Sequence, residues 1–188
     1  MTFALSDVQA IIRARSERAF SHLRRLIVVD TTTREQWKAA LNIGEVAYEK
    51  LGAVHLLWHG MWAFKVDAKG ERTDLVYQEA VSGGFEEQPF ADGLVLTEWK
   101  VAKSDSEAAR KFGEARDQAK CYAKGVLAGN VLRAFRYLIV VSPDAVPVPD
   151  DVEHEAVVYR HINIPVSPAS PSQYSRRQSH RSRRRISE

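Results

Sequence analysis

Residues Leu94-Val95-Leu96-Thr97-Glu98-Trp99-Lys100-Val101 carry the pattern that most strongly indicates the fold class of this 188-residue chain. It has the apolar composition of a strand, in which successive side chains point to opposite faces. Glu98 and Lys100 therefore share one face with two leucines, and Trp99 lies on the other. Because both faces are mostly apolar, the pattern predicts a strand covered by helices on both sides. A buried carboxylate and a buried amine are costly unless they are paired or bind a metal, so this pair indicates chemistry more than packing.

The segments around this strand predict alternating helices and strands. Helical periodicity is expected over residues 6–27, and a second helix over 34–51 or as far as 58, with Gly44 and Gly52 as weak points. A third helix is expected from residue 104 or 105 to about 127. The expected strands are residues 61–66, 72–81, 94–101, 136–142 and 155–165.

In this order the first three strands can form an antiparallel meander, and the next helix can cross over so that the fourth strand pairs in parallel. The predicted fold class is α/β, with a mixed five-stranded sheet flanked by helices. We expect a helical extension over residues 1–33, a core domain over 34–165 and a disordered tail over 166–188 that is rich in Ser, Pro and Arg.

The net charge of +3 is unevenly distributed. The last 22 residues carry six arginines and one glutamate, which leaves 21 basic and 23 acidic residues in the body. Such a tail is read either as a nucleic-acid tether that contacts phosphates or as a solvated extension. The six arginines are Arg176, Arg177, Arg181, Arg183, Arg184 and Arg185.

A single cysteine, Cys121, excludes an internal disulfide and a thiolate metal cluster. The N-terminus lacks a basic segment followed by an apolar run, and no stretch is long and apolar enough to span a bilayer. A cytoplasmic protein without membrane contact is therefore expected.

Other polar residues occupy expected strands and helices next to the strand that carries Glu98 and Lys100. Asp74 is near the start of the second expected strand. Gln118 and Tyr122 are four residues apart on the helix that follows the third strand, so they share a face. Glu45 and Glu49 have the same spacing on the second helix.

In these motifs and their order the chain resembles the PD-(D/E)XK nuclease superfamily, in its RecB-like branch. That family carries an acidic residue on the second core strand and (D/E)-x-K on the third, which Asp74 and Glu98-Trp99-Lys100 match. Gln118-Ala-Lys-Cys-Tyr122 resembles the family's Q-x-x-x-Y motif. Either Glu45 or Glu49 would stand for the acid of the first core helix. The residue before Asp74 is Thr73 and not the proline of the family name.

The resemblance implies a restriction-endonuclease-like core that hydrolyses DNA with Mg²⁺ or Mn²⁺. Asp74, Glu98 and the backbone carbonyl of Trp99 would bind the metal, as hard oxygen ligands do. Lys100 would orient the attacking water or stabilise developing charge, Gln118 would contact Lys100 or a phosphate, and Tyr122 would support it. A homodimer, or a partner protein that supplies specificity, would fit so small a nuclease.

Two other interpretations remain open at this stage. The domain could have lost catalysis and act as a nucleic-acid-binding or assembly module, or the motif could be a coincidence in a structural α/β protein. His55 and His59 are also four residues apart, as helical metal ligands can be. Because no third ligand is evident, we interpret them as core or interface histidines.

Overall fold

The computed structural model describes residues 3–64, 67–68, 71–72, 75–80, 92–124 and 135–168. Its helices are α1 (Phe3–Val29), α2 (Thr31–Ala40), α3 (Glu45–Trp58) and α4 (Asp105–Lys124). Its strands are β1 (Trp62–Phe64), β2 (Asp67–Ala68), β3 (Glu71–Arg72), β4 (Leu75–Ala80), β5 (Asp92–Val101), β6 (Phe135–Ser142), β7 (Val152–His154) and β8 (Val157–Pro165). Asp74 and the arginines of the tail lie outside the described residues.

The main sheet is mixed and has the strand order β1-β4-β5-β6-β8-β7. As predicted, β1, β4 and β5 pair antiparallel, and β5 pairs with β6 in parallel after the α4 crossover. The four longer strands form the centre, and the three-residue strands β1 and β7 add an edge on each side. The short β2 and β3 pair only with each other.

The expectation of five strands was wrong because β7 folds back on β8 in a tight hairpin. His154 pairs with Val157, and the two residues between them, Glu155 and Ala156, have φ angles of 52° and 61°. Positive φ at both central positions is the geometry of a type I′ turn, for which Asn-Gly is the usual sequence signal. Glu-Ala gives no such signal, so the turn was missed.

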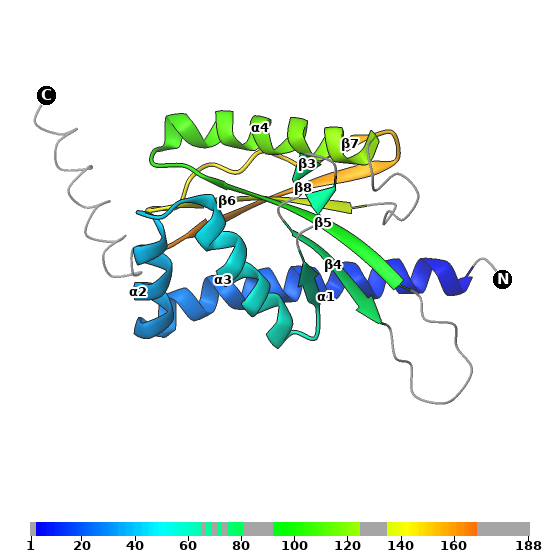
Figure 1. The fold of residues 1–188 in the computed structure, drawn as a ribbon, viewed down its shortest axis with the longest axis horizontal. Helices are drawn as coiled ribbons and strands as arrows, with labels where there is room; N and C mark the ends of the chain where they lie inside the picture. Colours follow the sequence, from blue (N-terminus) through cyan, green and yellow to red (C-terminus); the bar gives the residue numbers. More distant parts are fainter. Residues whose placement is uncertain are drawn as a thin grey trace, which may run out of the picture.

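Helices cover the sheet on both faces (Figure 1). α4 lies over one face, where its alanines and Phe112 pack against Leu138 and Val140 of β6. On the other face, the apolar side of α1 and residues of α2 and α3 share one core with Trp99 and Ile139. The α1 helix thus takes part in the same hydrophobic core as the sheet.

The single helix expected from residue 34 onward is two helices, which is a correction. The chain leaves α2 at Ala40 and starts α3 at Glu45, with Gly44 between them at a φ of 103°. Glycine adopts this left-handed region without steric cost, so Gly44 allows the chain to change direction. Gly52, in contrast, lies within α3 without interrupting it. Among the described helices, none combines the length and apolar character needed to cross a membrane.

Candidate active site

Strand β5 presents Glu98 and Lys100 to the face of the sheet that α4 covers. Leu96, two residues before Glu98, belongs to the core beneath α4, whereas Trp99 belongs to the core beneath α1, α2 and α3. By the alternation of a strand, Glu98 and Lys100 lie on the side of Leu96. Glu98 is fully buried and Lys100 nearly so.

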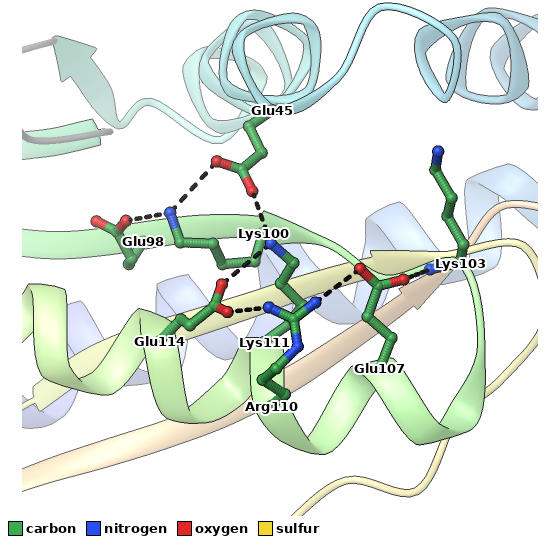
Figure 2. Close-up of polar contacts among 8 residues, drawn as sticks. All are labelled: Glu45, Glu98, Lys100, Lys103, Glu107, Arg110, Lys111 and Glu114. Carbon is green, nitrogen blue, oxygen red and sulfur yellow. Dashed lines mark hydrogen bonds and ion pairs between the residues drawn. The ribbon is translucent and has the colours of Figure 1, made fainter.

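Lys100 joins two carboxylates from different parts of the chain. Its Nζ atom lies 2.9 Å from Oε1 of Glu98 and 3.3 Å from Oε2 of Glu45 (Figure 2). Glu45 is the first residue of α3, so the turn at Gly44 determines the position of this carboxylate. The two glutamates and the lysine carry one net negative charge when all are ionised, which leaves the group attractive to a cation.

Helix α4 adds a second lysine to the same network. Nζ of Lys111 lies 3.9 Å from Oε1 of Glu45 and 3.0 Å from Oε2 of Glu114. The contact with Lys111 is the main cause that holds the pKa of Glu114 below its usual value, and Arg110 adds to it. Figure 2 shows how Glu45 approaches Lys100 from α3 while Lys111 and Glu114 approach from α4.

The outer part of this network fixes the start of α4. The backbone N–H of Glu107 donates to Oγ of Ser104 at 3.3 Å, and the backbone N–H of Lys103 donates to Oε2 of Glu107 at 2.8 Å. This is close to a capping box, in which a serine and a glutamate three residues later satisfy the first helix donors. Of the two caps predicted, Ser104 is the one that bonds. The helix that crosses the site therefore starts at a defined place.

The second glutamate of α3, Glu49, is buried one turn after Glu45. Glu45 forms an ion pair with Lys100. Because residues four apart share a helix face, both belong to the same side of α3.

Gln118 lies on the face of α4 that carries Lys111 and Glu114, since it follows them by seven and four residues. Its side chain is half-buried. Tyr122 extends the same stripe by one turn, within the helix, but its side chain is outside the described part of the structure. Sequence reasoning missed Lys111 and Glu114, although their spacing from Gln118 was a signal that could have found them.

The indole of Trp99 anchors β5 from the opposite face. Its ring centre lies 6.3 Å from that of Phe20 and 6.1 Å from that of Trp37. Its Nε1–H donates to Oγ1 of Thr97 at 3.2 Å, so the buried donor is satisfied. A Cβ added at Gly52 would lie 2.4 Å from the indole, so α3 can approach β5 this closely only with glycine there.

Comparison of the chain with models of known protein families, with curated proteins and with solved structures gave no match.

Proposed function

We propose that this protein is a Mg²⁺-dependent nuclease with a restriction-endonuclease-like core, which hydrolyses phosphodiester bonds of DNA. One observation carries the proposal: Nζ of the buried Lys100 lies 2.9 Å from Oε1 of the buried Glu98 on the same central strand and 3.3 Å from Oε2 of Glu45 at the start of α3. An ion pair without a function would be expected on the surface, whereas Glu98 and Lys100 are buried in the middle of the sheet. The order of strands and helices in the PD-(D/E)XK resemblance supports it further.

The donor set fits a hard divalent cation. Glu98 and Glu45 both reach the same ammonium group, so their oxygens gather in a small region. Mg²⁺ and Mn²⁺ prefer carboxylate oxygens, a backbone carbonyl and water over nitrogen ligands. In this proposal Glu98 and the carbonyl of Trp99 hold the ion, and Glu45 supports it. When bound, it would neutralise phosphate charge and make a water more acidic.

Asp74 would supply a further carboxylate, although it lies outside the described residues. Leu75, the first described residue of β4, pairs with Thr97 in the antiparallel register of β4 on β5. In this proposal Asp74 and Glu98 would share the ion, since two carboxylates can bind one divalent cation.

The remaining residues have roles that follow from their chemistry. Lys100 would donate hydrogen bonds to the attacking water and stabilise charge that develops on the phosphate. Gln118 would donate to a phosphate oxygen or orient Lys100, with Tyr122 as support. The arginines of the tail, together with a second copy of the chain or a partner protein, would add affinity for DNA that depends on salt.

The test is cleavage of supercoiled plasmid and of single-stranded DNA by the purified chain, with Mg²⁺, with Mn²⁺ and with EDTA. Lys100→Ala and Glu98→Gln should abolish cutting. Lys103→Ala is the matched control, because Lys103 is an exposed lysine three residues along the chain and should leave cutting unchanged. Equal cutting by wild type and Lys100→Ala would show that the assignment is wrong.

The catalytically inactive alternative makes a different prediction. A module used only for nucleic-acid binding or assembly would show no saturable binding of Mg²⁺ or Mn²⁺ in a calorimetric titration. The body of the chain, with 21 basic and 23 acidic residues, is less basic than most DNA-binding surfaces, which is the observation in its favour.

A further inference from the structure

A second polar cluster lies away from the carboxylates, between α1 and α3. His22 comes from α1, and His55 and His59 come from the end of α3. Each offers a ring nitrogen, and the three nitrogens lie within 4.8 Å of one another. The two histidines of α3 were interpreted as core or interface residues because no third ligand was evident in the sequence. The packing of α1 against α3 supplies that third residue.

We propose that His22, His55 and His59 bind one Zn²⁺-class transition-metal ion that joins α1 to α3. The ring centres are 5.3 Å, 5.1 Å and 5.1 Å apart, so the three imidazoles form a nearly equilateral triangle. Three imidazoles around a tetrahedral ion with Zn–N bonds of about 2.0–2.1 Å have ring centres about 5 Å apart. Nδ1 of His22 lies 3.0 Å from Nε2 of His59, close to the roughly 3.3 Å between two ligands of such an ion.

The buried member of the cluster has its tautomer fixed by the backbone. Nε2 of His55 lies 2.9 Å from the carbonyl oxygen of Ala19, which can only accept a hydrogen bond. In the neutral ring Nε2 therefore carries the hydrogen and Nδ1 carries the lone pair that a metal needs. This is the arrangement in which a backbone carbonyl orients a metal-binding histidine.

Protons compete weakly with a metal at this cluster. Burial is the main cause that lowers the pKa of His55, to about 4, and it also lowers the pKa of His59. The lowered pKa of each ring favours the neutral form that can bind a metal. Arg18, on α1, also lowers the pKa of His59 and weakly opposes a cation. The negative end of the α3 dipole acts in the other direction, since His59 is the C-cap of that helix.

The fourth coordination position would face solvent, because His22 is exposed and His59 half-buried. Water, hydroxide or a small anion could occupy it. Imidazole nitrogens favour Zn²⁺, Co²⁺, Ni²⁺ and Cu²⁺, whereas Mg²⁺ takes oxygen ligands. The cluster and the carboxylate network are thus chemically separate, so failure of either proposal leaves the other unaffected.

The experiment uses the full chain after removal of any affinity tag and treatment with EDTA followed by dialysis. Zn²⁺ is titrated by calorimetry, and Co²⁺ is added in parallel as a spectroscopic probe. The expected result is one ion per chain, with the visible absorption bands of a tetrahedral Co²⁺ site. Zn²⁺ should also raise the melting temperature, because it binds the folded pair of helices.

His22→Gln and His59→Gln are the informative variants. Neither histidine is fully buried, so both variant proteins should fold. Loss of a direct ligand should weaken Zn²⁺ binding by more than the roughly 10–100-fold that loss of an outer contact costs. It should also remove the rise in melting temperature. His154→Gln, an exposed histidine on β7, is the matched control and should bind Zn²⁺ as the wild type does. Absence of saturable binding, or binding that His22→Gln leaves intact, would overturn the proposal.

Discussion

The carboxylate–lysine network and the histidine cluster meet the same helix, α3, at opposite ends. Glu45, its first residue, reaches Lys100, and His59, its C-cap, lies with His22 of α1. The first group is built of opposite charges that compensate one another. The second is built of three imidazole rings with no acidic side chain among them.

Burial acts differently on these two kinds of group. In the network, burial keeps opposite charges together, because separating them would leave a charge without compensation. In the histidine cluster, burial removes charge, as the lowered pKa of His55 shows. One region thus favours hard oxygen ligation and the other favours ligation by neutral nitrogen.

The largest expected effect comes from breaking the buried ion pair on one side only. Lys100→Ala would leave the fully buried Glu98 poorly compensated, at a cost of about 3–5 kcal/mol in the free energy of unfolding. The double variant Glu98→Gln with Lys100→Met should recover most of that stability but no nuclease activity. Urea denaturation measures the first effect and DNA cleavage the second. A double variant as unstable as Lys100→Ala would contradict the pairing.

Acidification should act on the histidine cluster. Because the pKa of His55 in the folded chain is about 4, below its ordinary value of about 6.5, the unfolded chain binds more protons between these values. Stability is therefore complete above about pH 6.5 and declines as the pH falls towards 4, by roughly 2–3 kcal/mol for this group. Urea unfolding in EDTA at a series of pH values tests this.

In that series, His55→Asn should show a smaller loss of stability than the wild type between pH 6.5 and 4. The groups that face His55 are His22, His59 and the carbonyl of Ala19. Saturating Zn²⁺ should oppose the loss, since protons and metal compete for the same nitrogens. His154→Gln serves as the control. If it changed the pH dependence of the unfolding free energy as much as His55→Asn does, His55 would not be the cause of the loss.

A change at Gly52 should disturb both regions at once. Gly52→Ala would place a Cβ 2.4 Å from the Trp99 indole and push α3 away from β5. Overpacking of this kind costs about 1–3 kcal/mol. Gly113→Ala, where a Cβ would meet nothing within 4 Å, is the matched control and should be tolerated. Thermal unfolding measures the melting temperature of both variants. Equal melting temperatures would mean that α3 and the Trp99 indole move apart at little cost.

The smallest effect is expected at the outer edge of the network. Arg110 pairs with Glu107 and Glu114 on the surface of α4, where ion pairs contribute about 0–1 kcal/mol. Arg110→Ala should therefore change stability by less than about 1 kcal/mol and leave cleavage intact. Urea denaturation measures the effect on stability, and cleavage assays measure the effect on activity. A large loss of activity without a loss of stability would instead place Arg110 in the site.

Much of the core could be predicted because its signals are local. Alternation along residues 94–101 indicated that both faces of β5 are covered, and the helix after it indicated the parallel pairing with β6. The sequence indicates Gly44 only as a weak point of a helix, because glycine allows a positive φ but does not require one. The β7 hairpin was missed because Glu155 and Ala156 adopt a turn that their residue types do not indicate.

That Glu98 and Lys100 share a face of a buried strand follows from the residue pattern alone, since side chains alternate with a period of two. The spacing of His55 and His59 likewise places them on one face of a helix. The partners of these pairs come from the packing of distant elements: Glu45 at Lys100, 55 residues earlier in the chain, and His22 at His59, 37 residues earlier. Contacts over such separations depend on how the helices dock on the sheet, and the period of any single element does not encode that docking.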